Sequence, residues 1–173
     1  MATAKTGSFY LTETVTLTAG TVNGGRLQGS IDMGAYVNVA TGQAIAIDQV
    51  DFVFQNGADF GGNVNTMLAA DGSITVQLCD LNPGTAFVRA DDQSLIASGA
   101  LCIDVSANLA TMVSDLYPDN HGSASLSESF MVVNDTLYLV AGNNANPVGA
   151  EDLYVTVRIR YGQLQPGQTL TIT

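Results

Sequence analysis

The stretch Leu153-Tyr154-Val155-Thr156-Val157-Arg158-Ile159-Arg160-Tyr161 alternates apolar and polar side chains at every step. Alternation with a period of two is the geometry of a β-strand with one buried face and one solvated face. The stretch therefore predicts a strand whose apolar side chains enter a core. Its Tyr154, Arg158 and Arg160 side chains are predicted to face outward.

The same alternation recurs along the chain, separated by turn-forming residues such as Asn82-Pro83-Gly84. It predicts strands at residues 9–18, 26–33, 44–55, 73–80, 86–89, 94–105, 129–133, 136–141, 152–161 and 168–173. Within 44–55 the alternation changes phase near Asp48, which predicts a bend or β-bulge at that residue.

One segment has a different period. Apolar residues follow the i, i+3, i+4, i+7 spacing of an amphipathic helix at Leu109, Met112, Val113 and Leu116. Pro118 follows directly, and proline commonly stands just beyond a helix end. We expect one short helix over residues 108–116.

Many short strands, little helix and connections of unequal length favour an all-β Greek-key fold. The sequence therefore predicts a jelly-roll β-sandwich or barrel of about eight strands with one short helix. A chain of 173 residues fits one domain. We expect a single jelly-roll domain over residues 9–173, preceded by a flexible N-terminal arm over residues 1–8.

The chain is strongly acidic, with sixteen Asp and Glu against five Lys and Arg and a net charge of −11. Direct binding to nucleic acid depends mainly on attraction between cations and phosphates, so this charge argues against it. No apolar run approaches the roughly 20 residues of a transmembrane helix. The N-terminus lacks the apolar run of a signal peptide, so synthesis in the cytoplasm is expected.

The residues that could perform catalysis are few. The sequence has one histidine, His121, so one chain cannot supply a three-histidine metal site. A hydrolase site built from Asp115, Asp119 and His121 is an alternative, but no nucleophile or base motif supports it. We expect that the protein is not an enzyme.

A structural calcium ion is the one cofactor considered, because calcium is bound by several carboxylate, amide and carbonyl oxygens. No Asp-x-Asp-x-Asp-Gly loop is present. The candidate ligands are the oxygen-bearing residues Asp80, Asp115, Asp119 and Asn120.

The two cysteines, Cys79 and Cys102, are too few for a disulfide framework or a cysteine-based zinc site. Both fall on the less apolar sides of their predicted strands. One interpretation is two free thiols. The other is a cross-strand disulfide that forms after release from the cell, which requires Cα atoms within about 7 Å.

The outward residues of 152–161 suggest a protein interface. Exposed arginine and tyrosine are frequent anchors of protein contacts. In an acidic chain Arg158 and Arg160, beside Tyr154, could hold another acidic subunit. Salt bridges within the sheet are the alternative interpretation. Lys5, in the arm, is a further interface candidate.

Two runs, Ile31-Asp32-Met33-Gly34-Ala35-Tyr36-Val37-Asn38-Val39 and Gln49-Val50-Asp51-Phe52-Val53-Phe54-Gln55, look like those of marine phage structural proteins. In its whole architecture the chain resembles the single jelly-roll capsid proteins of tailless icosahedral viruses, especially those with an internal membrane. The resemblance implies a capsid or decoration subunit that self-assembles with copies of itself and other capsid proteins.

The resemblance also implies a virion location, after synthesis in the host cytoplasm, with the shell lying over an internal membrane. An alternative function is a carbohydrate-binding or adhesive β-sandwich module. Such a module would need exposed aromatic side chains, and the sequence offers tyrosines but no tryptophan.

Overall fold

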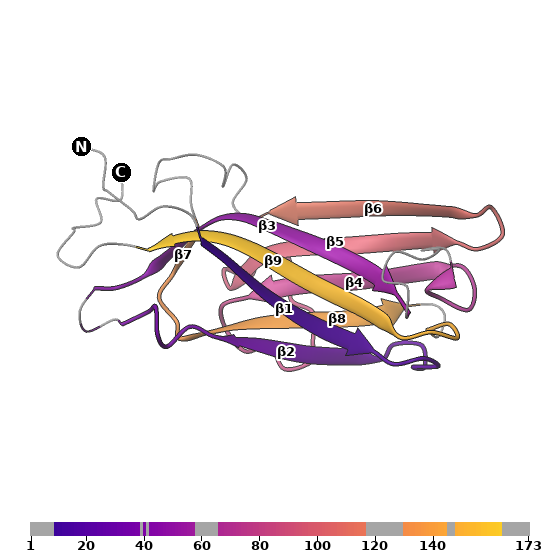
Figure 1. Cartoon of the computed structure of the whole chain (residues 1–173), viewed down its shortest axis with the longest axis horizontal. Helices are drawn as coiled ribbons and strands as arrows, with labels where there is room; N and C mark the ends of the chain where they lie inside the picture. Colours follow the sequence, from indigo (N-terminus) through magenta and orange to yellow (C-terminus); the bar gives the residue numbers. More distant parts are fainter. Residues whose placement is uncertain are drawn as a thin grey trace.

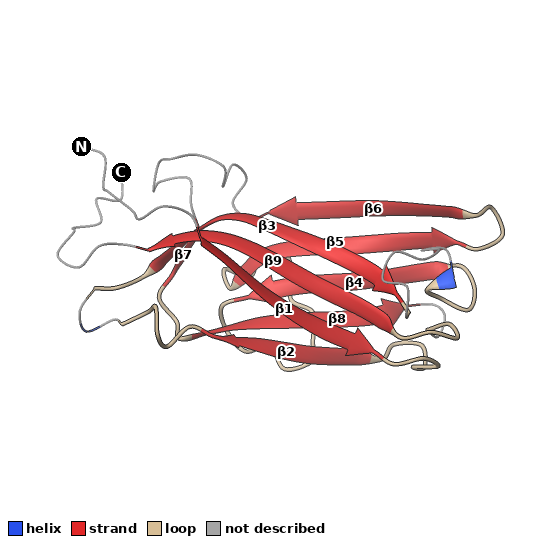
Figure 2. Cartoon of the chain, viewed as in Figure 1, coloured by secondary structure: helices blue, strands red, loops and turns tan. Residues whose placement is uncertain are grey.

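A computed structural model gives the structure of residues 9–38, 40, 42–57, 66–116, 130–144 and 148–163. These residues form nine strands and, within the described ranges, no α-helix. The short blue stretch in Figure 2 is 3₁₀ helix. The strands are β1 (Phe9–Leu17), β2 (Arg26–Asp32), β3 (Ile45–Asn56), β4 (Gly72–Cys79), β5 (Leu95–Asp104), β6 (Leu109–Leu116), β7 (Phe130–Val132), β8 (Thr136–Asn144) and β9 (Leu153–Gln163).

The strands form two antiparallel sheets that face each other (Figure 1). One sheet has the order β1-β9-β3-β7 and the other the order β2-β8-β4-β5-β6. The chain stays in the second sheet from β4 to β6 and changes sheet between each of the remaining pairs of successive strands. This is the strand order of a jelly roll, extended by β6 at one edge. The predicted fold class is therefore confirmed.

The core lies between the sheets and follows from the alternation in the sequence. In β9 the inward Val155, Val157 and Ile159 are fully buried, and they pack in one cluster with residues such as Leu139 of the opposite sheet. Gly99 in β5 makes room for a large ring: a Cβ atom there would lie 2.9 Å from the Phe52 ring. The close approach of β5 to β3 thus depends on glycine at this position.

The predicted irregularity near Asp48 is a β-bulge. The pairing of β3 with β9 shifts between Ile47 and Gln49, so that the register passes over Asp48. The extra residue changes the phase of the alternation. Beyond it, Val50 and Phe52 face the core and Gln49 and Asp51 face outward.

The expected helix over residues 108–116 is wrong. Residues 109–116 form β6, which pairs with β5 from Leu109 opposite Asp104 to Leu116 opposite Ala97. A tight connection precedes β6, with Asn108 at φ 55° and the Asp104 carboxylate accepting from the Ala107 amide at 2.8 Å. β6 lies at the sheet edge with apolar side chains on both faces, so its sequence lacks the alternation of a half-buried strand.

The expected strand at 86–89 is also wrong. This segment belongs to the long connection between β4 and β5, and it lies against β4 through a side chain. The Gln77 amide donates to the Val88 carbonyl at 2.9 Å and accepts from the Val88 amide at 2.8 Å. One glutamine thus supplies the pair of bonds that a neighbouring strand would supply. The arm at 1–8 and the predicted strand at 168–173 lie outside the described residues.

Candidate interface surfaces

The outward side of β1, β9 and β3 forms one polar surface, termed here the arginine face. β9 is its central strand, between β1 and β3. The register places the outward residues of the three strands side by side. The face consists of Tyr10, Thr12, Thr14 and Thr16 of β1, Tyr154, Thr156, Arg158 and Arg160 of β9, and Gln49, Asp51, Val53 and Gln55 of β3.

Arg158 is exposed on this face, and its guanidinium lies 5.9 Å from the centre of the Tyr10 ring. Asp51 is its register partner on β3. The Asp51 carboxylate instead accepts bonds from the Gln49 amide, at 3.0 and 2.9 Å. Within the described part of the chain Arg158 makes no ion pair. The interpretation that this residue forms a salt bridge within the sheet is therefore not supported by the described residues.

Arg160 lies one step further along β9, half-buried between Tyr10 and Gln49. Its Nε is buried and has no hydrogen-bond partner among the described residues. A buried donor that loses its water without gaining a partner costs about 1–3 kcal/mol. Arg160 therefore has unused hydrogen-bonding capacity on the same face as Arg158.

Tyr154 stands at the other end of the face, half-buried between Thr16 and Gln55. Six residues of strand separate it from Arg160, a span of about 20 Å. Between them Thr14 and Thr156 join β1 to β9 by a hydroxyl–hydroxyl bond of 2.8 Å. The structure thus brings Tyr154, Arg158 and Arg160 onto one surface, as the sequence predicts, while Lys5 lies outside the described residues.

The outward side of the second sheet is divided into two halves. The β4–β5 connection covers the half made by β2, β8 and β4. It is held there by Gln77, by the Gln28 amide bonded to the Gly84 carbonyl at 2.6 Å, and by the Arg26 guanidinium 4.5 Å from the Phe87 ring centre. As a result Gln77 and Cys79 are buried although they lie on the outward side.

The other half, made by β5 and β6, is not covered by described residues; it is termed here the uncovered edge. Cys102 is exposed in β5, and in β6 the exposed fractions are 61% for Leu109, 45% for Met112 and 59% for Val113. Sequence reasoning missed this surface. The signal that could have indicated this surface is the set of apolar residues at 109, 112, 113 and 116, which was interpreted as a helix.

The two cysteines are free, which corrects the disulfide interpretation for this chain. Cys102 pairs with Ser73, six residues from Cys79 along β4, so the two residues lie about 20 Å apart. That distance is far beyond the reach of a disulfide. Burial, together with the nearby Asp92 and Asp80 carboxylates, raises the pKa of the Cys79 thiol to about 12.

The calcium candidates are not brought together within the described residues. Asp80 begins the β4–β5 connection, where burial raises the pKa of its carboxyl group despite an opposing backbone hydrogen bond. Asp115 belongs to β6, on the far side of β5 from β4. Asp119, Asn120 and His121 lie outside the described residues. In the described ranges no three His, Cys, Asp or Glu residues cluster as metal ligands would.

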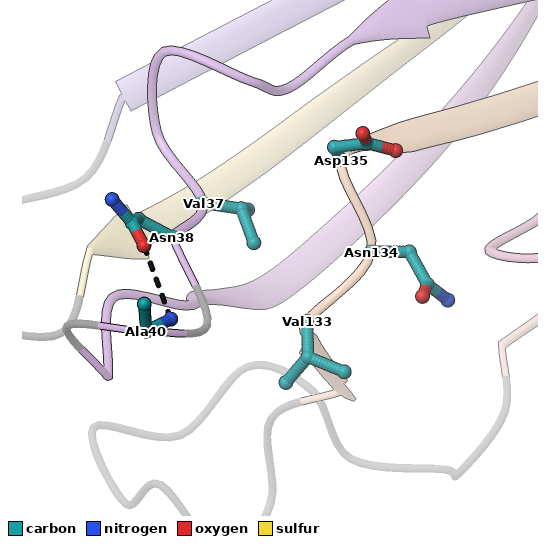
Figure 3. Close-up of a pocket in the computed structure, with 6 residues that line it drawn as sticks. All are labelled: Val37, Asn38, Ala40, Val133, Asn134 and Asp135. Carbon is teal, nitrogen blue, oxygen red and sulfur yellow. Dashed lines mark hydrogen bonds between the residues drawn. The ribbon is translucent and has the colours of Figure 1, made fainter.

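A shallow hollow of about 490 Å³ lies where the β2–β3 connection meets the β7–β8 turn (Figure 3). Its lining is Val37, Asn38, Ala40, Val133, Asn134 and Asp135. The Asn38 carboxamide accepts from the Ala40 amide at 3.1 Å, and the Asn134 amide donates to the Asp80 carbonyl at 2.8 Å. With one carboxylate and no described nucleophile, this lining offers no arrangement for catalysis.

The described residues include no helix with the length and apolar character that crossing a membrane requires. No protein-family model and no curated protein matches the sequence.

The solved structures that match this chain include chains from two plant viruses. A chain of Desmodium yellow mottle tymovirus is 11% identical with a TM-score of 0.36, and the match covers 96% of this chain and 85% of that chain. A chain of turnip yellow mosaic virus is 11% identical with a TM-score of 0.38, covering 100% and 89%. At such scores the jelly-roll assignment rests on the strand order and register described above.

Proposed function

We propose that this chain is a virion structural protein, a capsid or decoration subunit that acts by self-assembly into an icosahedral shell. Three features support the proposal. The domain is a jelly roll without a described catalytic arrangement. It has a polar face with two arginines in an acidic chain, and it has an uncovered apolar edge.

The observation that carries the proposal is the state of Arg158. The chain has sixteen acidic residues, yet this exposed guanidinium is paired with none of the described ones, and its register partner Asp51 is bonded to Gln49. Two of the five basic residues stand on this one face. An acidic surface of a neighbouring copy would meet both, and arginine contributes strongly to protein interfaces.

The finer elements of the proposal follow from the sequence. The partners are copies of the chain and other capsid proteins, in a virion made in the host cytoplasm. The net charge of −11 opposes direct contact with nucleic acid, so an internal membrane or another protein would separate the shell from the genome. Calcium held by Asp80, Asp115, Asp119 and Asn120, from one or more copies, would reduce repulsion between acidic subunits.

The test is light scattering on the purified protein across concentration, with calcium and with a chelator. Wild-type protein should form discrete oligomers or shell-sized particles, and Arg158→Ala should shift the mass toward the monomer. Loss of particles upon chelation would support the calcium role. A wild-type protein that is monomeric at every concentration and calcium level would refute the proposal.

The chain offers a matched control for this variant. Arg89 is also exposed, in the β4–β5 connection, where it makes a 3.4 Å ion pair with Asp91. Arg89→Ala removes the same charge from a different surface. Assembly that survives Arg89→Ala and fails in Arg158→Ala would locate the contact on the arginine face. Equal effects would mean that net charge alone controls assembly.

A carbohydrate-binding module is the second candidate, and Tyr10 is the observation that favours it. Tyr10 is 61% exposed on the arginine face, where a sugar could stack on its ring. A glycan screen with wild-type protein and Tyr10→Ala would test this. Binding that is lost in Tyr10→Ala, in a protein that stays monomeric, would replace assembly by carbohydrate recognition.

A further inference from the structure

Among the described strands, β6 lies at a sheet edge with one side unpaired. It pairs with β5 along its whole length, and no described strand pairs with its other side (Figure 1). That side presents backbone N–H and C=O groups that can pair with a further strand. Exposed sheet edges usually have features that prevent such pairing, including charged or inward-pointing polar side chains and very short strands.

The other three edge strands have such features. β1 has the carboxyl-bearing Glu13 at an inward position, opposite the buried Val157 and against Gly29 of the other sheet. β2 begins with Arg26 and ends with Asp32. β7 is three residues long. β6 has none of them from residue 109 to 113, and the sequence is free of charge from residue 105 to 114.

The side chains of β6 also favour pairing with an apolar strand. Leu109, Met112 and Val113 are each exposed by 45% or more. Register with β5 puts Leu109 and Val113 on the outward side with Cys102, and Met112 on the side of the buried Leu101. A partner strand with apolar residues at matching positions would bury all three.

Resting on the proposed function, we propose that the occupant of this edge is β6 of a second copy, paired antiparallel about a two-fold axis at Thr111. Such a pair joins the two five-stranded sheets into one continuous sheet. It is a symmetric contact in which the same patch is used on both copies.

The sequence of β6 is self-complementary in this register. A two-fold axis perpendicular to the sheet keeps outward residues on the outward side, so only residues of the same face can lie opposite each other. With Thr111 opposite itself, Leu109 faces Val113 of the second copy, and Ala110 faces Met112. Each exposed apolar residue therefore meets another apolar residue.

The charge of the chain favours this edge over other self-contacts. Two copies with a net charge of −11 each repel one another across most surfaces. The stretch from residue 105 to 114 contains no charge. Asp115 would lie beyond the paired residues 109–113 and so would not face its own copy in the partner.

Cysteine cross-linking tests both the contact and its register, in a Cys102→Ser background to remove the exposed native thiol. Opposed residues in an antiparallel pair have Cα atoms about 4.5–5.5 Å apart, within disulfide range. Thr111→Cys should therefore give a covalent dimer under mild oxidation. Val113→Cys is the matched control, since its two copies would lie about 13 Å apart. Mixing Leu109→Cys with Val113→Cys protein should restore the cross-link.

Lysine variants provide a second readout that requires no new thiol. Leu109→Lys and Val113→Lys each place a charge at the apolar contact, and each should weaken dimer formation by at least about tenfold, measured by light scattering. Val22→Lys makes the same change at a residue that is 71% exposed in the β1–β2 turn, and it should leave association unchanged. Equal association of all three variants would overturn the inference.

The outcomes separate this inference from the proposed function. Assembly by wild-type protein without a Thr111→Cys cross-link would overturn the β6 contact and leave the structural role standing. Cross-linking of Val113→Cys as readily as Thr111→Cys would overturn the register and with it the two-fold pair. A wild-type protein that does not associate, together with a Thr111→Cys variant that does not cross-link, would refute both.

Discussion

The arginine face and the uncovered edge are both outward surfaces of one jelly roll, yet they differ in chemistry. On the arginine face, β9 and β3 each have a neighbouring strand on both sides, and β1 is joined to β9 through the hydroxyls of Thr14 and Thr156. Most of the side chains of this face are polar. The uncovered edge lies at the end of its sheet, and its large exposed side chains, Leu109, Met112 and Val113, are apolar. The outward side of a strand in this fold can therefore be polar and exposed, covered by a connection, or apolar and exposed.

The second sheet makes the same point within a single layer. Gln77 and Cys79 of β4 are buried under the β4–β5 connection, whereas Cys102 of β5, one strand away, is exposed. The difference comes from the connection and not from the strands themselves.

Ile159→Ala, compared with Arg158→Ala, should give the largest difference in stability between the two sides of β9. Ile159 is fully buried between the outward Arg158 and Arg160. Its truncation should lower the free energy of unfolding by about 2–5 kcal/mol, because it leaves a cavity in the core. Arg158→Ala, on the opposite side, should change it by less than about 0.5 kcal/mol. Denaturant unfolding measures both, and equal losses would contradict the division of β9 into a core side and an outward side.

Gln77→Ala should loosen the β4–β5 connection, so that the covered half of the second sheet becomes exposed like the β5–β6 half. The variant removes both bonds to Val88, at a cost of about 1–3 kcal/mol in the free energy of unfolding. It should also free the connection, so that trypsin cleaves faster after Arg89.

Gln49→Ala is the control, because Gln49 also makes two bonds, to Asp51 on the solvated arginine face. It should cost less than about 0.5 kcal/mol. Unchanged cleavage after Arg89 in Gln77→Ala would mean that other contacts hold the connection.

Asp80→Asn should give a small increase in stability at neutral pH. Burial raises the pKa of this carboxyl group above its usual 3.8, so the folded state binds its proton more tightly than the unfolded state. The burial penalty is therefore fully present above the folded pKa and disappears as the pH falls toward the unfolded value. Unfolding at pH 7 should show the gain in stability. Unfolding near pH 3, where the wild-type carboxyl group is protonated and therefore as neutral as the asparagine, should not. A gain of equal size at both pH values would point to packing and not to charge.

Cys102→Ser should have the smallest effect on stability, less than about 0.5 kcal/mol, because the side chain is exposed. It should nevertheless remove the one thiol that reacts in the folded protein. Cys79 is buried and its pKa is raised to about 12, so almost none of it is thiolate at neutral pH. A colorimetric thiol assay should find one reactive group in the native wild type, and two after unfolding. Two rapid groups in the native protein would show that the connection opens readily.

The alternation of residues was enough to predict most of the fold. Strands such as β1, β3 and β9, with one buried and one outward face, appear close to their predicted positions, and so does the bulge at Asp48. β6 was mistaken for a helix because an edge strand exposed on both faces has no alternation to read. Residues 86–89 were mistaken for a strand because their pairing partner is a glutamine side chain, which no strand periodicity reveals.

The candidate site was only partly predictable. Alternation places Arg158 and Arg160 on the outward side. The sequence could not show that the Asp51 carboxylate would accept its hydrogen bonds from Gln49 and not from Arg158. It likewise placed Cys79 and Cys102 on similar faces, while the register that separates them depends on how β4 and β5 align. Long-range pairing decides such contacts, and one sequence contains little information about it.

The position of β9 links the proposed self-association to protein synthesis. The ribosome makes β1 and β3 long before β9, yet β9 lies between them and is hydrogen-bonded to both. The first sheet therefore cannot close until residue 163 has left the ribosome exit tunnel. Since Arg158 and Arg160 arrive with this strand, a nascent or truncated chain has no arginine face. A copy thus acquires that surface only when its domain is complete, which would keep unfinished chains out of the assembly.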